Sequence, residues 1–386
     1  MNTRKQISNF VKGLILLLVV GNFASCKNEL DIYADGEAQP IIYGVLNPYD
    51  SVQSFRIIKS FAGEGDPSEY AQVPDSSYFR DVDVRLKELQ FGEVTNSWQL
   101  IETTITNKES GDFFGPEQKI YTVTTTKSSG SAFYINPEAE FELEGTLDGR
   151  EIGGKFEIVK EKQGRAAFFM ADGNNFARFQ RRGDITIVNG DEPNELTFDL
   201  DYPVGTKVAG LKLVFTYFET YAGEEEAVEK QIEFDLGEQI IDNAQEPKQV
   251  SFKFSGARFY ERIGSGIEDI ADVKNLLFRK TGPVEFKMIA VSEDLFYYRQ
   301  VKNTSSGIAQ DRPEYTNVEN GFGVLAGRQV VTMSEQLVAH GFPPIEVILS
   351  KFTEKELVTG LILGYTGGKG FCADASHNLG DITCDN

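Results

Sequence analysis

The regular alternation of apolar and polar residues restricts the fold of this chain more than any other feature. Apolar residues take every second position in the segment 82–87, and the segment 211–217 repeats this period. A period of two places successive side chains on opposite faces of a strand, one buried and one exposed to water. Turn sequences such as 47–50 and 148–150 interrupt these runs at short intervals. The pattern predicts a mainly β protein with antiparallel, sandwich-like sheets.

The length of 386 residues favours two folded domains. We predict an N-terminal β-sandwich of Ig-like type over residues 41–164, because short strands and turns follow one another throughout it. Residues 165–386 are predicted to form a second sandwich-like domain with longer strands, short helical insertions and a Cys-containing tail. The expected architecture is therefore two antiparallel β-sandwich-like domains in series.

Helices are expected only as short insertions in the second domain. The segments 255–263 and 270–278 have helical spacing of their apolar residues. Ser292 is a candidate N-cap, because acidic residues follow it in what would be the first turn. Thr353 and Glu356 have the spacing of a capping box, which predicts a helix beginning at Thr353.

An apolar run near the start of the chain predicts its compartment. Basic residues precede the run 13–20, as in a secretory signal peptide. Residues 23–26 then resemble the lipobox of bacterial lipoproteins, in which the cysteine is diacylated and becomes the mature N-terminus. The resemblance implies a signal peptide over 1–25, lipidation of Cys26 and anchoring to the outer membrane. A cleaved signal without lipid and a membrane-anchoring segment are the alternatives; the latter needs about 20 apolar residues, more than this run offers.

The residues just after Cys26 are polar and acidic. We predict that 26–40 form a flexible tether between the lipid and the folded domains. Acidic residues in this place resemble the export signals of some Bacteroidetes lipoproteins, which favours the cell surface over the periplasmic face. Either face belongs to the cell envelope.

The chain is strongly acidic, with a formal net charge of −21. The predicted signal peptide carries three basic residues and no acidic one, so its removal would leave a net charge of −24. Such a surface repels nucleic acid, and we therefore exclude nucleic acid as a partner. The acidic residues are spread along the chain and form no EF-hand loop, so the acidity is interpreted as a source of solubility.

Two cysteines remain once Cys26 is assigned to the lipid. Cys372 and Cys384 lie twelve positions apart in a glycine-rich terminal segment. In an oxidising compartment they are a candidate disulfide, worth on the order of 3 kcal/mol in the chain-entropy model. Free thiols are one alternative. A metal site that also uses His377 is another, but it lacks a fourth ligand and the paired short spacings of structural zinc sites.

Catalytic motifs are absent from the sequence. The two histidines, His340 and His377, lie in no recognisable motif, and no Gly-x-Ser-x-Gly elbow occurs. No cofactor or metal site is predicted. A pair of carboxylates, which suffices for glycoside hydrolysis, stays open as an alternative because the chain has 59 acidic residues.

Aromatic residues are the candidate ligand-binding groups that the composition offers. The aromatic pair at 259–260 and the aromatic triplet at 296–298 are either core residues or an exposed face on which sugars stack. The sequence does not decide between these two interpretations. Any ligand recognised in this way would be a glycan or a peptide.

A longer resemblance covers most of residues 38–330. The segments 40–48, 55–57 and 303–327 resemble those of a Bacteroidetes outer-membrane lipoprotein family of unknown function. The resemblance implies an envelope β-sandwich protein that is sometimes encoded beside TonB-dependent receptors, and it supplies no catalytic residue. We therefore expect a non-catalytic binding or accessory component, with a TonB-dependent receptor or another envelope protein as a possible partner. A surface carbohydrate-active enzyme and a structural or adhesive surface protein are the alternatives.

Overall fold

The computed structural model describes residues 38–60, 67–106, 108–109, 111, 114–127, 131, 133–160, 184–185, 188–189, 192–244, 248–303, 315–339, 344, 346–373 and 382–384. Strands dominate these residues and the helices are few and short, so the predicted mainly β, sandwich-like fold class is confirmed. Cys26, the predicted signal peptide and most of the predicted tether lie outside the described residues. Within the described part, no helix is long and apolar enough to cross a membrane.

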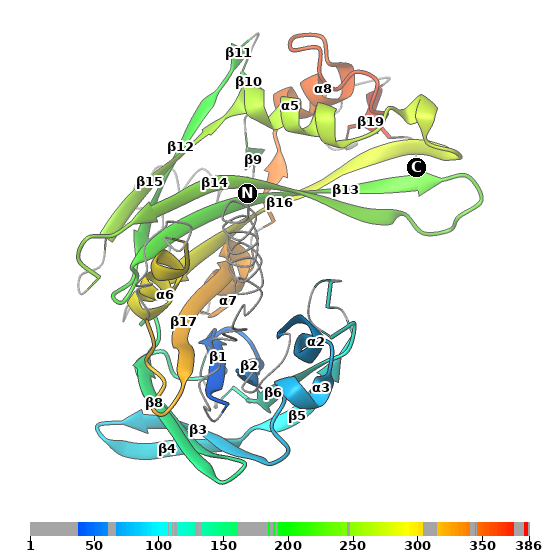
Figure 1. Cartoon of the computed structure of the whole chain (residues 1–386). Helices are drawn as coiled ribbons and strands as arrows, with labels where there is room; N and C mark the ends of the chain where they lie inside the picture. Colours follow the sequence, from blue (N-terminus) through cyan, green and yellow to red (C-terminus); the bar gives the residue numbers. More distant parts are fainter. Residues whose placement is uncertain are drawn as a thin grey trace, which may run out of the picture.

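Two sheets packed face to face form the N-terminal half of the molecule (Figure 1). The alternation of apolar residues explains this packing, because the inward positions of both sheets, such as Ile42, Ile57, Leu86 and Phe141, are fully buried in one core. One sheet contains, in spatial order, β1 (Pro40–Leu46), β2 (Val52–Lys59), β6 (Gln118–Thr124) and β5 (Ile101–Ile105). The other contains β4 (Glu93–Gln99), β3 (Val82–Gln90), β7 (Glu140–Leu147) and β8 (Arg150–Glu157).

The C-terminal half is built around a long antiparallel sheet. The rings of Phe215, Phe234, Phe254 and Phe259 contact one another between this sheet and the elements that cover it. The long strands are β13 (Val208–Tyr221), β14 (Val228–Ile240) and β16 (Leu276–Val291), and the covering elements are β12 (Glu195–Tyr202), β15 (Lys248–Ser255) and α5 (Gly256–Gly266).

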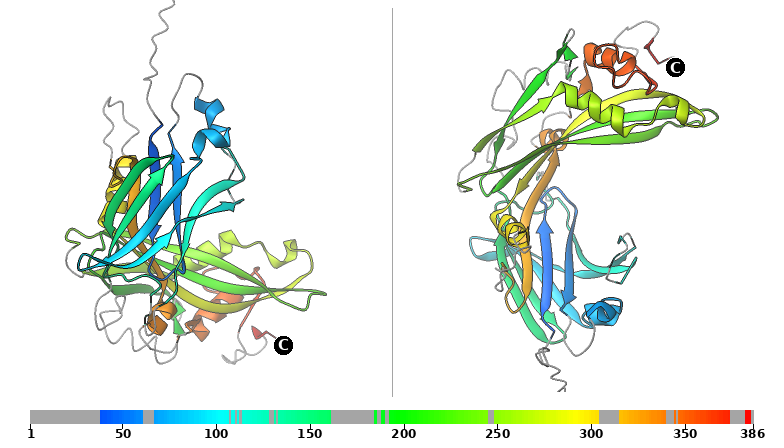
Figure 2. Two further views of the ribbon diagram at one scale, coloured as in Figure 1. Left: turned by 90° about the horizontal axis from the view of Figure 1, so that it is seen from below. Right: turned by 45° about the horizontal axis from the view of Figure 1, so that its top comes forward.

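Strand β17 (Phe322–Thr332) joins the two halves, as Figure 2 shows. Its first part pairs in parallel with β1, and its second part pairs antiparallel with β16. At Gly323 the backbone has a φ of 114°, and a Cβ atom would lie 1.9 Å from the carbonyl oxygen of Ile42. Only glycine allows so close an approach of the two strands. The domain boundary at residue 164 stays a prediction. Strands from before and after this residue belong to one continuous hydrogen-bonded sheet.

Small elements complete the described part of the chain. The helices are α2 (Pro67–Ala71), α3 (Pro74–Ser77), η2 (Ile270–Asp272), α6 (Glu293–Asn303), α7 (Met333–Ala339) and α8 (Lys351–Thr359). The short strands are β9 (Asp184–Ile185), β10 (Val188–Asn189), β11 (Glu192–Pro193), β18 (Ile348–Leu349) and β19 (Phe371–Cys372). Of these strands, β10 pairs with β11, β9 pairs in parallel with β18, and β19 pairs in parallel with β16.

Three of the four predicted helices are present, one of them with a different start, and the helix predicted at 270–278 is wrong. Helix α5 covers the predicted segment 255–263, and α6 begins directly after Ser292. The hydroxyl of Ser292, however, accepts a hydrogen bond from the amide of Gly327. In the segment 270–278 only one 3-10 turn forms, because β16 begins at Leu276 and pairs with β13.

The predicted start of α8 at Thr353 is also wrong. The helix begins one turn earlier, and Ser350 is its N-cap, with a hydroxyl that accepts from the amide of Thr353. The carboxylate of Glu356 is buried and accepts from the amides of Ile362 and Leu363, which follow the helix. Glu356 therefore holds the turn after the helix and does not cap its beginning.

The predicted disulfide between Cys372 and Cys384 is present. It joins Cys384 to β19, which pairs with residues 279–280 of β16. The buried Arg279 supports the same region, since its guanidinium pairs with Glu219 at 2.9 Å and donates to the carbonyl groups of Glu268 and Lys369. Because the charges of Arg279 and Glu219 are removed from water together, each depends on the other.

Candidate functional site

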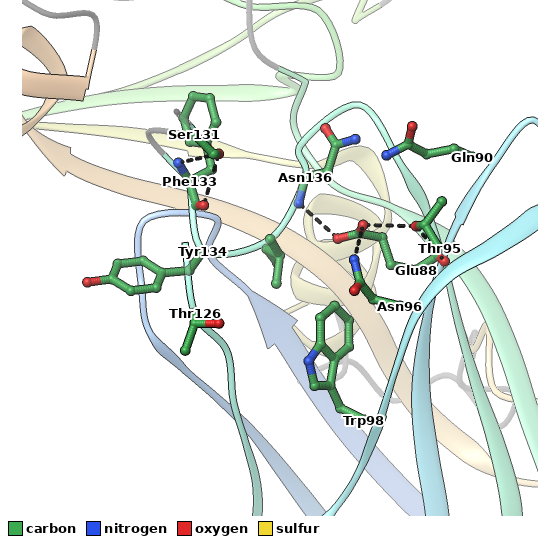
Figure 3. Close-up of a pocket in the computed structure, with 11 residues that line it drawn as sticks. Glu88, Gln90, Thr95, Asn96, Trp98, Thr126, Ser131, Phe133, Tyr134 and Asn136 are labelled. Carbon is green, nitrogen blue, oxygen red and sulfur yellow. Dashed lines mark hydrogen bonds between the residues drawn. The ribbon is translucent and has the colours of Figure 1, made fainter. Parts of the chain in front are cut away.

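A pocket of about 350 Å³ lies at one end of the N-terminal sandwich. Its walls are the hairpin of β3 and β4 together with Thr126, Ser131 and residues 133–136 (Figure 3). The described lining side chains are amides, hydroxyls, aromatic rings and one isoleucine around one carboxylate: Glu88, Gln90, Thr95, Asn96, Trp98, Thr126, Ser131, Phe133, Tyr134, Ile135 and Asn136.

Glu88 is the central group of this pocket. It follows Val84 and Leu86 on the inward face of β3, so the strand carries its side chain into the end of the sandwich, where it is 3% exposed. A β-bulge between Glu88 and Leu89 ends the regular register with β4 at this point. The alternation that builds the core thus also places a carboxylate at its rim.

Three neighbours donate hydrogen bonds to this carboxylate. The Thr95 hydroxyl and the Asn96 side-chain amide donate to Oε1 at 3.0 and 2.9 Å, and the backbone amide of Asn136 donates to Oε2 at 3.0 Å. Among the described residues, Glu88 has no ion-pair partner. Hydrogen bonds to a charged acceptor compensate for its removal from water and fix its orientation.

Residues 133–136, which line the pocket, are held in place by contacts outside it. The amide of Tyr134 donates to the carbonyl of Pro48, and the ring of Phe133 packs edge-on against Tyr49. The side chain of Asn136 accepts from the amide of Glu138, which forms a local turn. These contacts give the pocket a fixed wall opposite β4.

Trp98 supplies an aromatic surface to the pocket. It lies opposite Leu86 in the β3–β4 pair and is half-buried, whereas its neighbours on β4 are exposed. One part of the indole packs on the core, and the ring also lines the pocket below Asn96 and Glu88 (Figure 3). It is the only tryptophan of the chain. An indole beside amide and hydroxyl groups suits a ligand that has both apolar faces and hydroxyl groups.

The aromatic candidates chosen from the sequence do not lie in this pocket. Phe259 and Tyr260 are fully buried in the C-terminal core. Phe296 packs beside Val208 and Ile289, and Tyr298 stacks edge-on against Tyr43. These residues are mainly structural, as one of the two interpretations of the sequence held. Tyr297 is the exception, with 38% of its surface exposed.

Sequence reasoning missed Glu88 although a signal for it exists. The alternating run ends with a charged residue at the next inward position, two residues after Leu86. A charge at a position that should be buried often indicates a specific role. His340 and His377 lie outside the described residues, and within those residues no three His, Cys, Asp or Glu side chains could hold a metal ion.

No protein-family model matches the chain, and no curated protein matches it. Among solved structures, a match is the C-terminal globular domain of an oligosaccharyltransferase from Pyrococcus abyssi, with 12% sequence identity and a TM-score of 0.19. The match covers 60% of this chain and 45% of that chain. A TM-score this low supports no conclusion about fold or function.

Proposed function

We propose that this protein is a non-catalytic, lipid-anchored component of the bacterial cell envelope that binds an uncharged saccharide in the Glu88–Trp98 pocket. The observation that carries the proposal is the half-buried indole of Trp98 beside a carboxylate whose orientation is fixed by hydrogen bonds. A sugar ring has an apolar face that stacks on an indole, and its hydroxyl groups donate to carboxylates and accept from amides.

The composition of the pocket favours binding over hydrolysis. Glycoside hydrolysis uses two carboxylates on opposite sides of the scissile bond, separated by about 5–9.5 Å. Among the described lining residues Glu88 is the single carboxylate, and its oxygens already accept from Thr95, Asn96 and Asn136. Such a group is well placed to hold a ligand hydroxyl, and none of the described lining residues supplies the second carboxylate of a catalytic pair.

Trp98 makes the proposal directly testable, because its fluorescence reports on this pocket alone. Titration with a panel of neutral oligosaccharides is expected to shift or quench the emission for at least one of them. Gln90 lines the pocket, and Gln90→Ala should weaken that binding about 3- to 10-fold through loss of a hydrogen bond. The matched control is Gln231→Ala on the exposed strand β14, which should leave the affinity unchanged.

Two results would contradict this assignment. If no neutral saccharide changed the emission or bound by calorimetry, the pocket would not be a saccharide site. If the protein hydrolysed a glycan and Glu88→Gln abolished that activity, it would be a surface carbohydrate-active enzyme, the alternative considered from the sequence.

The envelope location rests on the sequence motif at Cys26, and its test is independent of the pocket. Cells that express the full chain should incorporate a labelled fatty acid into it, and Cys26→Ala should abolish the label. Crosslinking in intact outer membranes is expected to recover a partner such as a TonB-dependent receptor. Release of the unlabelled wild-type protein into the medium would instead identify a plain secreted protein.

A further inference from the structure

A second pocket, of about 330 Å³, lies on the outer face of the same sandwich. Strands β1 and β2 place it there, because the pairs Ile41–Ile58 and Tyr43–Arg56 alternate with inward-facing core residues. The other walls come from Ser77 at the end of α3, from Tyr78 after it, and from Lys108 and Phe114. The lining residues are Ile41, Tyr43, Arg56, Ile58, Lys59, Ser60, Ser77, Tyr78, Lys108 and Phe114.

This pocket is basic in a strongly acidic protein. Arg56, Lys59 and Lys108 line it, and no carboxylate stands among its described lining residues, although the whole chain has a net charge of −21. Arg56 and Lys59 have no ion-pair partner in the described part of the chain. Elsewhere on the same sandwich lysines do pair with glutamates, as Lys87 and Lys119 do.

The cations are close enough to influence one another. Burial lowers the pKa of Lys108, and the nearby charge of Arg56 lowers it further. The ammonium group of Lys108 donates to the carbonyl of Phe114, which fixes it at the wall of the pocket. An anion placed between these groups would relieve the repulsion between Lys108 and Arg56.

Apart from Ser60 and Ser77, the remaining lining residues are apolar or aromatic. Ile41 and Ile58 form the floor, and Tyr78 and Phe114 come from the segments beside it. Tyr43 is supported from behind by Tyr298 of α6, with ring centroids 5.8 Å apart. The pocket therefore offers rings and aliphatic side chains next to a guanidinium group, which binds carboxylate and phosphate groups with paired hydrogen bonds.

We propose that this second pocket binds a small anionic ligand, in which a carboxylate or phosphate group is attached to a ring or another flat apolar body. The anionic group contacts Arg56, Lys59 and Lys108, and the body of the ligand lies on Tyr43, Tyr78 and Phe114. No residue of this pocket lines the Glu88–Trp98 pocket, so the two sites are separate and their ligands differ in charge.

Benzoate and phenyl phosphate are suitable probes for calorimetric titration of the full protein. Acetate and inorganic phosphate carry the charge without the ring, and benzyl alcohol carries the ring without the charge. We expect the two ring-bearing anions to bind at least 10-fold more tightly than the other three compounds. Comparison of benzoate with phenyl phosphate identifies which anionic group the site prefers. Added salt should weaken their binding, and the emission of Trp98 should not change.

Arg56→Gln should weaken the binding of both ring-bearing anions about 10-fold or more. Arg85→Gln is the matched control, since Arg85 is an exposed arginine on the opposite sheet of the same sandwich and the change in charge is identical. Thermal melting establishes that both variants are folded. Equal binding of benzyl alcohol and benzoate, unchanged affinity in Arg56→Gln, or no binding of any probe would overturn the proposal. None of these results would bear on saccharide binding reported by Trp98.

Discussion

At the scale of single residues, Glu88 shows how a position can be predictable while its role is not. The alternation in β3 fixes that its side chain points inward, after Val84 and Leu86. The partners of the carboxylate come from β4 and from Asn136, which is 48 residues away in the sequence. No local pattern connects these segments, so the pocket appears only when the fold brings them together.

Glu88 is also expected to stabilise the end of the sandwich. In Glu88→Ala the donors of Thr95, Asn96 and Asn136 lose their common acceptor, and we expect the free energy of unfolding to fall by about 1–3 kcal/mol. Glu93→Ala, on the exposed part of the same hairpin, is the control and should change it by less than about 0.5 kcal/mol. Urea denaturation measures both. Equal effects of the two substitutions would show that the hydrogen bonds of Glu88 contribute nothing to stability.

At the scale of elements, the same capping pattern has different outcomes before two helices, α7 and α8. Thr353 and Glu356 have the spacing of a capping box, but the helix begins earlier, at Ser350. Thr332 and Glu335 have the same spacing and do form a capping box before α7, since each side chain accepts from the backbone amide of the other. The sequence supplies the pattern, whereas the strand that precedes each helix decides where the helix begins.

Glu335 of the capping box before α7 also permits a test of how the stability of the protein depends on pH. Burial raises the pKa of Asp50 and of Glu285, and the charge of Glu335 raises both further. Asp50 and Glu285 therefore bind their protons more tightly in the folded state than in the unfolded state. This difference in proton binding stabilises the folded state at low pH. The stabilisation is lost as the pH rises from about 4 through the folded-state pKa values.

Glu335→Gln keeps a capping side chain but removes the charge that acts on Asp50 and Glu285. The variant is expected to gain about 0.2–1 kcal/mol of stability at neutral pH and to match the wild type near pH 3, where Asp50 and Glu285, with their raised pKa values, are protonated in the folded state. Urea denaturation at the two pH values measures this difference. The control is Glu225→Gln in the exposed turn between β13 and β14. A gain of the same size at both pH values would contradict the electrostatic explanation.

The terminal disulfide is expected to act locally. Besides the bond between Cys372 and Cys384, the segment 382–384 is joined to Ala373 by two backbone hydrogen bonds. Cys384→Ser should therefore speed hydrogen exchange at the Ala373 amide, and reduction of the wild type should have the same effect. The chain-entropy model sets an upper limit of about 3 kcal/mol on the loss of global stability. Unchanged exchange in both cases would mean that packing alone holds this segment.

At the scale of the whole molecule, the pairing of distant strands is what sequence reasoning could not supply. The strands around 82–87 and 211–217 were predictable because alternation is a local property. The parallel pairing of β1 with β17 joins residues about 280 positions apart, and neither strand carries a signal for the other. Val318 and Leu325, from the second half of the sequence, consequently complete the N-terminal core.

This topology predicts that the sequence up to residue 164 is not an autonomous domain. A fragment of residues 38–164 lacks β17, so β1 would have one unpaired edge and the core would lose Val318 and the fully buried Leu325. We expect this fragment to show no cooperative thermal transition, or to aggregate. Fusion of residues 315–332 through a flexible linker should restore the transition, and the same fusion with Leu325→Asp should not. Circular dichroism and size-exclusion chromatography measure these outcomes. A cooperative transition in the unfused fragment would instead support a domain boundary at 164, with β17 added to a sandwich that is already stable.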